Sequence, residues 1–171
     1  MKILEQKVIF NGKKLTVRVD RAIEPSGKEV VREFVVHPGA VAIVARPSRD
    51  DVLLIRQFRY AAGKELIEIP AGTLEPDEDP RNTAIRELEE ETGYVAGQMI
   101  ERARFYTTPG FTSELMVLYE ALDLVKTRTN LDEDESIEVD VVGRHDALRM
   151  IDDGRIQDAK TILGLLMVLR G

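Results

Sequence analysis

The sequence predicts an α/β (α+β) fold in which helices flank a mixed β-sheet and a small antiparallel β-sheet comes first. Leu15, Val17 and Val19 alternate with polar residues, which is the period of a half-buried strand. Residues 41–45 form a continuous apolar run, typical of a central strand. Residues 80–92 and 158–170 carry apolar side chains at helical spacing, which indicates helices that each cover a core with one face.

The N-terminal segment is expected to form the antiparallel sheet. Its three strands are predicted at 2–10, 13–24 and 29–37. The Asn11-Gly12 pair and the Pro25–Lys28 stretch have the composition of tight turns between such strands. The His37-Pro38-Gly39 step then suggests a division into an N-terminal β-sheet appendage, 1–37, and a main domain, 38–171.

The main domain is expected to alternate strands and helices. Further strands are predicted at 52–60, 65–70, 98–107, 114–122 and 137–142, and a further helix at 145–153. The last helix has Ile162, Leu165 and Leu169 on one face. The polar residues 126–135 are expected to form a loop.

Composition excludes several classes of protein. At 171 residues the chain can bury a substantial core, and its net charge of −7 argues against a nucleic-acid-coating surface. The absence of cysteine excludes disulfides and thiolate chemistry, and two histidines disfavour a histidine-based zinc site. The N-terminus lacks the apolar core of a signal peptide and no apolar run approaches a membrane span, so a cytoplasmic location without membrane contact is expected.

Most of the candidate catalytic and metal-binding residues lie in the stretch from Gly72 to Tyr94, GTLEPDEDPRNTAIRELEEETGY. Asp79 is a favourable N-cap, Pro80 suits the first helical position, and Gly93 suits the left-handed residue that ends a helix. Ala84, Ile85 and Leu88 give this helix an apolar stripe. The helix is therefore predicted to begin after Asp79 and to end before Gly93.

Three acidic side chains share another face of that helix. Glu87, Glu90 and Glu91 lie three and four residues apart, within one turn, and their charges repel one another. A divalent cation would relieve this repulsion, since carboxylate oxygens are the ligands that Mg²⁺ and Mn²⁺ prefer. The alternative is a solvated acidic face.

The spacing of the whole stretch resembles the Nudix box. The matching positions are Gly72, Glu78, Arg86, Glu87, Leu88, Glu90, Glu91 and Gly93. Tyr94 departs from the aliphatic residue that is usual there, and no catalytic position is missing. The resemblance covers roughly 38–170 and implies a Nudix-type α/β/α sandwich that uses two or three Mg²⁺ or Mn²⁺ ions.

The resemblance also implies roles within the box. Glu87, Glu90 and Glu91 would hold the metals together with the backbone carbonyl of Ala71. Glu90 and Arg86 would be catalytic, with the Arg86 fork orienting a carboxylate. Glu78 would reach back to the same cluster. Gly72 is expected to permit a close turn where the strand becomes a loop.

The general base is expected outside the box. In the ADP-ribose pyrophosphatase branch of the family it comes from a late acidic loop, which residues 131–135 resemble. By that resemblance Glu133 is the candidate base and Glu135 an additional metal ligand. A solvated acidic loop is the alternative for each residue.

Other residues resemble the substrate-binding positions of the same branch. Pro109 lies 15 residues beyond Tyr94, in a segment with Gly110 and Phe111 that is similar to the branch's marker. The further candidates are Arg59 for the substrate's diphosphate, Arg32 from a partner subunit, and Glu114 facing the site. An ordinary Pro-Gly turn, exposed arginines and a surface residue at the start of a strand are the alternatives.

The function implied is divalent-metal-dependent hydrolysis of ADP-ribose to AMP and ribose 5-phosphate, extended to other nucleoside diphosphate sugars. An alternative is a hydrolase of nucleoside diphosphate sugars, dinucleotides or damaged nucleotides. A Nudix-fold nucleotide sensor that binds without turnover is a further alternative. The branch also implies a homodimer formed through the N-terminal strands, and no nucleic-acid partner.

Overall fold

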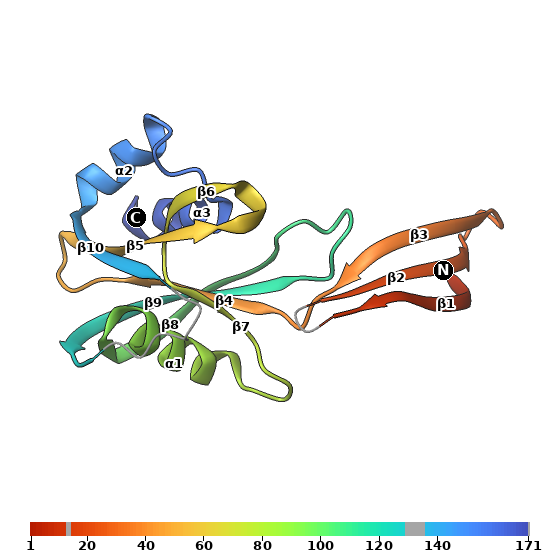
Figure 1. Cartoon of the computed structure of the whole chain (residues 1–171), viewed down its shortest axis with the longest axis horizontal. Coiled ribbons are helices and arrows are strands. Elements are labelled where there is room, and N and C mark those ends of the chain that lie inside the picture. Colours follow the sequence, from red (N-terminus) through yellow and green to blue (C-terminus); the bar gives the residue numbers. More distant parts are fainter. Residues whose placement is uncertain (13–14, 129–135, 171) are drawn as a thin grey trace. The chain divides into compact units, whose positions relative to one another are not determined.

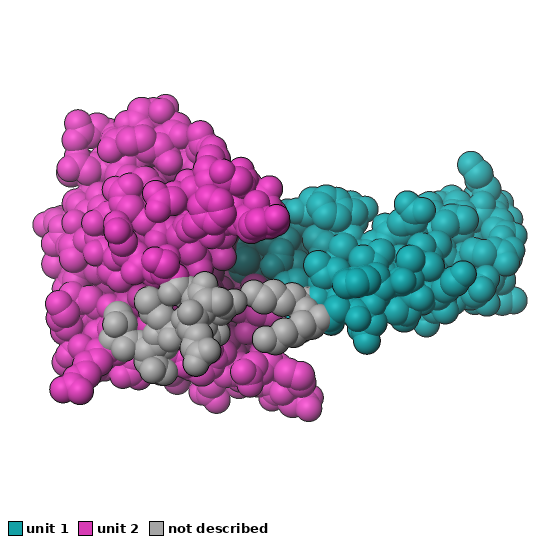
Figure 2. Space-filling model, viewed as in Figure 1, with its two compact units in different colours: residues 1–39, 105–116 teal, residues 40–104, 117–171 magenta. Residues whose placement is uncertain are grey.

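The computed structural model describes residues 1–12, 15–128 and 136–170. The chain forms two compact units, coloured separately in Figure 2. The first unit comprises residues 1–39 and 105–116, and the second comprises 40–104 and 117–171. None of the helices within the described ranges is long and apolar enough to cross a membrane.

Strands dominate the described residues, and Figure 1 labels each element. The strands are β1 Lys2–Asn11, β2 Thr16–Ile23, β3 Glu29–Val36, β4 Ala40–Ala45, β5 Asp51–Arg59, β6 Lys64–Glu68, β7 Ala71–Thr73, β8 Tyr94–Tyr106, β9 Leu115–Lys126 and β10 Ile137–Gly143. The helices are α1 Pro80–Thr92, α2 Arg144–Asp152 and α3 Ala159–Leu169, with a 3-10 turn η1 at Tyr60–Ala62.

Most elements agree with the predictions, and the differences have local causes. Strand β7 was not predicted, because its three residues acquire strand geometry only by pairing with β4. Strand β8 begins at Tyr94, immediately after the helix cap, rather than near residue 98. Strand β9 extends to Lys126, which was expected to lie in the loop.

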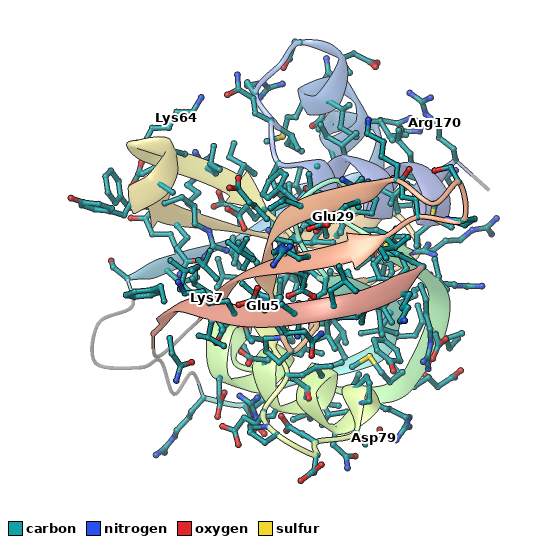
Figure 3. All side chains as sticks on the ribbon, turned by 90° about the vertical axis from the view of Figure 1, so that its right-hand side faces the viewer. Glu5, Lys7, Glu29, Lys64, Asp79 and Arg170 are labelled. Carbon is teal, nitrogen blue, oxygen red and sulfur yellow. The ribbon has the colours of Figure 1, made fainter. Side chains whose placement is uncertain are left out.

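The first unit contains an antiparallel three-stranded sheet in the order β1-β2-β3, as predicted. Arg21 of β2 contacts Glu5 of β1 and Glu29 of β3, two residues that Figure 3 labels. Every residue of β1 is exposed, including the large apolar ones. The exposed apolar side chains of β1 are Ile3, Leu4, Val8, Ile9 and Phe10.

The second unit contains two sheets, in the orders β10-β5-β6 and β7-β4-β9-β8. Strand β4 is buried along its whole length and lies between β7 and β9, which confirms the predicted central strand. Helix α1 packs against β4 and β7, and helix α3 packs against β4 and α2. Figure 1 shows α1 on one side of β4 and α3 on the other. This layering confirms the predicted mixed α/β architecture.

Residues of β4 on its two faces pack against α1 and α3. Val41 and Ile43 belong to a buried cluster with Ala84 and Leu88 of α1. On the other side, a Cβ on Gly164 of α3 would lie 2.9 Å from Ile69 Cδ1 and 3.1 Å from Val44 Cγ2. Helix α3 therefore approaches the sheet closely because residue 164 has no side chain. The two contacts fix α1 and α3 relative to the strands that carry the candidate site.

Candidate active site

Helix α1 has the ends that its sequence predicts. The Asp79 side chain accepts a hydrogen bond from the Arg81 N–H at 2.9 Å, and Pro80 is the first helical residue. Gly93 adopts φ 70°, in the left-handed region, and its N–H donates to the Glu89 carbonyl at 2.8 Å. These caps confirm both predicted boundaries of the helix.

The apolar stripe of α1 faces the core, as expected. Ala84 and Leu88 are fully buried, and Ile85 packs against the same cluster. Glu91 is 3% exposed, and its Oε2 accepts a hydrogen bond from the Ala71 N–H at 3.0 Å. The helix therefore presents a buried carboxylate to the start of β7, beside the apolar contacts that hold it there.

The close turn expected at Gly72 is not present. Gly72 lies within β7 opposite Val41. A Cβ at this position would stand 2.0 Å from both Cδ and Oε1 of Glu87. The glycine is thus required by side-chain space rather than by backbone conformation. Its missing side chain allows Glu87 to lie directly on the strand.

Arg86 joins three of the box carboxylates. Its Nη1 lies 2.8 Å from Glu90 Oε2 and 3.0 Å from Glu87 Oε1. On the other edge, Nε and Nη2 each lie 3.3 Å from an oxygen of Glu78. Glu78 therefore does reach back to the cluster, and one guanidinium holds carboxylates from the loop and from two positions on the helix.

The charges of this cluster reinforce one another. The hydrogen bonds from Arg86 hold the pKa of Glu78 below its ordinary value. Partial burial disfavours the charge on Arg86, but the hydrogen bond to Glu78 and the charge of Glu87 outweigh it and raise the Arg86 pKa. Both groups are therefore ionised at neutral pH.

The donor set suits a divalent cation in its chemistry. Carboxylate oxygens of Glu78, Glu87 and Glu90 lie 3.3, 3.0 and 2.8 Å from nitrogens of the Arg86 guanidinium. Such hard oxygen donors match Mg²⁺ or Mn²⁺. Within the described ranges, no three acidic or histidine side chains surround a common point as metal ligands do. The side chains at hand instead orient toward Arg86.

Arg59, the predicted diphosphate contact, is held by a buried carboxylate. Its Nε and Nη2 donate to the two oxygens of Glu68 at 2.8 and 2.6 Å. Glu68 is 1% exposed, whereas the Arg59 side chain is 39% exposed. The hydrogen bond to Glu68 raises the pKa of Arg59, against the opposing effect of burial. Arg59 is thus held at two points of its guanidinium while its side chain stays partly exposed.

Lys160 of α3 completes this second charged group. Its Nζ contacts Glu68 Oε2 and also lies 3.0 Å from Asp158 Oδ2. Burial opposes ionisation of Glu68, but the hydrogen bonds from Arg59 and the charge of Lys160 hold the pKa of Glu68 below its ordinary value. Neither Glu68 nor Lys160 was among the predicted site residues. The sequence does contain a sign that Glu68 has a specific partner, since it is the one charged residue between Leu66 and Pro70 in a predicted apolar strand.

The other predicted substrate-binding residues all lie in the first unit. Arg32 of β3 bonds Glu24 at 2.6 Å. The Pro109–Phe111 segment forms a turn in which the Phe111 N–H donates to the Thr108 carbonyl. The Phe111 carbonyl accepts from the Val35 N–H at 2.8 Å, so the turn is attached to the end of β3.

Glu114 follows that turn and is partly buried within the same unit. Its carboxylate accepts a hydrogen bond from the Thr107 hydroxyl and lies 3.7 Å from His37 Nε2. The structure thus brings Arg32, Glu114 and the turn residues Pro109 and Gly110 into one compact unit. The box and Arg59 belong to the other unit.

A hollow of about 390 Å³ lies along the outer face of α1. Its lining includes Arg86 and Glu90 of the box, and Arg128 from the segment that follows β9. The hollow is completed by Asn82, Ile85 and Glu89. Glu133 and Glu135, the predicted base and additional ligand, lie outside the described residues.

Comparisons with known proteins agree with the box. Residues 36–164 match the model of the NUDIX domain. The chain is 42% identical to an ADP-ribose pyrophosphatase of Bacillus subtilis, over 94% of this chain and 91% of that protein. It is also 42% identical to a methanol dehydrogenase activator of Bacillus methanolicus, over 96% of this chain and 90% of that protein.

A solved structure shares the fold. The crystal structure of an ADP compounds hydrolase superposes with a TM-score of 0.87, covering 99% of this chain and 94% of that one. Its sequence identity is 23%, so the likeness concerns the fold alone. The sheets and helices described above are therefore a fold that this solved structure shares.

Proposed function

Because this chain belongs to the Nudix family, we propose that it hydrolyses the pyrophosphate bond of ADP-ribose and of related nucleoside diphosphate sugars. The observation that carries the proposal is the group of four carboxylates at the box. Glu78, Glu87 and Glu90 converge on Arg86, and Glu91 is fixed by the Ala71 N–H. Such a concentration of ordered oxygen donors suits a substrate whose phosphates are bound through cations.

In the reaction a water oxygen attacks one phosphorus and the bond from that phosphorus to the bridging oxygen breaks. The water proton passes to a base, and the bridging oxygen leaves with the other phosphate. ADP-ribose then gives AMP and ribose 5-phosphate. Two or three Mg²⁺ or Mn²⁺ ions, held by Glu87, Glu90, Glu91, Glu135 and the Ala71 carbonyl, would neutralise phosphate charge and acidify the water.

The chain's own residues prepare the site in distinct ways. Arg86 holds the helix carboxylates against their mutual repulsion, through contacts of 2.8 and 3.0 Å to Glu90 and Glu87. Gly72 leaves room for Glu87 on β7. Arg59 presents a fixed guanidinium whose exposed edge can bind a phosphate oxygen.

We assign the general base to Glu133 on the family resemblance of its loop. A carboxylate that accepts the proton of the attacking water contributes a factor of roughly 10² to 10⁴ to the rate. Glu133→Gln is therefore expected to lower kcat strongly while leaving the affinity for Mg²⁺ nearly unchanged. A loss of metal affinity with little loss of kcat would make Glu133 a ligand instead.

The choice of ADP-ribose is supported by two observations. The Bacillus subtilis relative named ADP-ribose pyrophosphatase aligns with nearly the whole chain. The segment Pro109-Gly110-Phe111 resembles that branch's marker in sequence, and Arg32 and Glu114 belong to the same compact unit as this segment. The further proposed substrate contacts are Pro109, Gly110, Phe111 and Glu114, with Arg32 supplied by a partner subunit.

A turnover screen tests the substrate. ADP-ribose, UDP-sugars, GDP-sugars, dinucleotides and oxidised nucleotides would each be incubated with Mg²⁺ and the products separated. Release of AMP and ribose 5-phosphate from ADP-ribose far faster than products from the others is expected. Rapid turnover of another compound with ADP-ribose intact would instead support the broader hydrolase alternative.

The Glu91→Gln variant separates catalysis from binding without turnover. Glu91 is buried against Ala71, so the amide can keep the position while losing the charge. We expect turnover to fall by at least a hundredfold. Glu89→Gln, on the same helix, is the matched control and should remain active. A wild-type chain that binds ADP-ribose without cleaving it would be a nucleotide sensor.

The N-terminal strands are proposed as a dimer interface within a 1–37 appendage. Strand β1 exposes Ile3, Val8, Ile9 and Phe10, and an exposed apolar group of this kind favours association. A second copy of the chain is the proposed partner. The main domain would then be 38–171.

A second candidate function follows from the relative named as a methanol dehydrogenase activator. In this second proposal the chain stimulates a methanol dehydrogenase. Methanol dehydrogenase of Bacillus methanolicus would be assayed with the wild-type chain and with Glu91→Gln. Stimulation by the wild type and not by the variant would tie activation to hydrolysis, and no stimulation by either would remove this candidate.

A further inference from the structure

Glu68 is a buried carboxylate that the reaction outlined above does not use. It ends strand β6 and is 1% exposed, between the partly buried Ile67 and the fully buried Ile69. An ionised carboxylate at such a position requires strong compensation. Arg59 and Lys160 provide it, and they keep its pKa below the ordinary value despite burial.

The geometry of the Arg59–Glu68 pair fixes the guanidinium. Nε and Nη2 lie on one edge of the guanidinium plane and bind two different carboxylate oxygens, at 2.8 and 2.6 Å. A two-point contact of this kind sets both the position and the plane of the group. The edge formed by Nη1 and the second N–H of Nη2 points away from Glu68, and the side chain is 39% exposed.

Helix α3 holds Glu68 from a second direction. Lys160 contacts Glu68 Oε2 and is 12% exposed, and it is itself held by Asp158, the N-cap of the helix. The next residue of the strand segment is held by the same helix, because the Ile69 N–H donates to Thr161 Oγ1 at 2.9 Å. Glu68 is thus anchored to the start of α3 as well as to Arg59.

The same segment connects Arg59 to the box. Three residues beyond Glu68, the Ala71 N–H donates to Glu91 at 3.0 Å. The short stretch 68–71 is therefore held by α3 at one end and by α1 at the other. Arg59 is therefore joined through Glu68 to the same short segment whose other end is hydrogen-bonded to Glu91 of the box.

We infer that Glu68 and Lys160 are positioning residues that hold the Arg59 guanidinium in a fixed orientation, with its outward edge ready to bind a phosphate of a diphosphate substrate. The inference rests on the proposed function. A free arginine side chain would lose several rotatable bonds on binding, whereas Arg59 is already ordered by its buried partner. The network therefore contributes to substrate affinity through Arg59 and makes no contact with the reacting atoms itself.

A second buried carboxylate in the same unit provides a matched control. Glu120 of β9 is also 1% exposed and is held by two cations, Arg46 at 2.8 Å and Arg102. Burial opposes its ionisation, and the hydrogen bonds from these arginines hold its pKa below the ordinary value. Glu120→Gln removes the same charge from an equivalent setting that does not include Arg59.

The test compares steady-state kinetics with ADP-ribose for the wild type, Glu68→Gln and Glu120→Gln. Glu68→Gln is expected to raise KM about tenfold with a change in kcat of less than about threefold, because binding shared by ground and transition states is lost. Glu120→Gln should leave KM unchanged. Equal KM values for these two variants would show that the Arg59–Glu68 ion pair has only a structural role. That result would overturn the inference.

A double variant tests whether Glu68 acts through Arg59. If it does, Arg59→Ala and the Arg59→Ala/Glu68→Gln double variant should have the same KM. If the increase in KM of the double variant is instead the product of the two single increases, Glu68 acts independently of Arg59. Urea unfolding of each variant separates loss of folded protein from loss of affinity.

Lys160 offers a milder change if Glu68→Gln does not fold. Lys160→Met is expected to raise KM about threefold, and Lys160→Arg, which keeps the charge, should restore it to near the wild-type value. Equal KM values for Lys160→Met and the wild type would remove Lys160 from the positioning network.

Calorimetric Kd values for ADP-ribose, measured without divalent metal, provide a readout that does not require turnover. A wild-type chain without turnover would refute the proposed function alone, since the order of the variants' Kd values would still test the positioning. If the wild type has a normal rate and the two variants Glu68→Gln and Glu120→Gln have the same KM and Kd, only the inference is refuted.

Discussion

The Glu87 side chain occupies the place where a side chain on Gly72 would stand, since a Cβ there would lie 2.0 Å from Glu87 Cδ. Gly72→Ala should therefore push Glu87 away from β7. We expect turnover to fall by about tenfold or more, with little change in the free energy of unfolding, because the displaced atoms are the end of a flexible side chain. Turnover assays and urea unfolding measure the two effects.

Gly143→Ala is the control for this change. No atom lies within 4 Å of a Cβ at position 143, and the backbone φ of −63° suits any residue. This variant should retain activity and lose roughly 0.5–1 kcal/mol of stability, because alanine is a poorer N-cap than glycine for α2. A similar loss of turnover in Gly72→Ala and Gly143→Ala would contradict the steric explanation at Gly72.

Arg86→Lys should lower kcat by about tenfold or more. The guanidinium reaches Glu78, Glu87 and Glu90 together, and a single ammonium cannot keep that geometry. Arg56→Lys is the comparison, because Arg56 forms an exposed ion pair of 2.8 Å with Asp140, far simpler than the Arg86 cluster. Steady-state assays on ADP-ribose that show equal kcat for both variants would contradict a special role for the fork.

Divalent metal should raise the unfolding temperature through the box carboxylates. A ligand that binds only the folded state stabilises it by about 2.7 kcal/mol at a hundred times its Kd. Thermal unfolding with Mg²⁺ or Mn²⁺ should therefore show an upward shift in the wild type. Glu87→Gln should reduce the shift and Glu89→Gln should preserve it. A shift of equal size in all three proteins would place the metal elsewhere.

Acid should destabilise the protein through its buried carboxylates. The folded pKa values of Glu68 and Glu120 lie below their ordinary values. The stability these groups contribute is therefore fully present above the unfolded pKa, about 4.3, and is lost as pH falls through the folded values. Urea unfolding at a series of pH values below about 5 should show this decline.

The Glu120→Gln variant isolates one of these groups. Its unfolding free energy should fall less steeply with acidification than that of the wild type, because one proton-binding group is removed. The difference should persist in high salt, since Glu120 is only 1% exposed and buried pairs are weakly screened. Parallel pH profiles for the two proteins would contradict the assignment.

The exposed apolar residues of β1 should control the oligomeric state. Val8 is 56% exposed, and Val8→Glu is expected to convert a dimer into a monomer in light-scattering measurements. Val125→Glu places the same charge on β9, where the valine is 62% exposed, and should leave the molecular mass unchanged. A monomeric wild type would contradict the proposed interface.

Much of the fold could be predicted because it depends on local patterns. Asp79, Pro80 and Gly93 define the ends of α1 through backbone hydrogen bonding and conformational preference, which act within one or two turns. The continuous apolar run of β4 indicated a strand buried on both faces. Strand β7 could not be predicted, since three residues form a strand only when their partner is present.

The sequence by itself determined the family and the acidic platform, because helical spacing places Glu87, Glu90 and Glu91 within one turn. Only the tertiary structure decided why residue 72 is glycine, since the reason is the position of a side chain 15 residues further along the chain. Only the tertiary structure joined Arg59 to Glu68 and Lys160, from β5, β6 and α3. Contacts between distant segments follow from packing, and no local pattern encodes them.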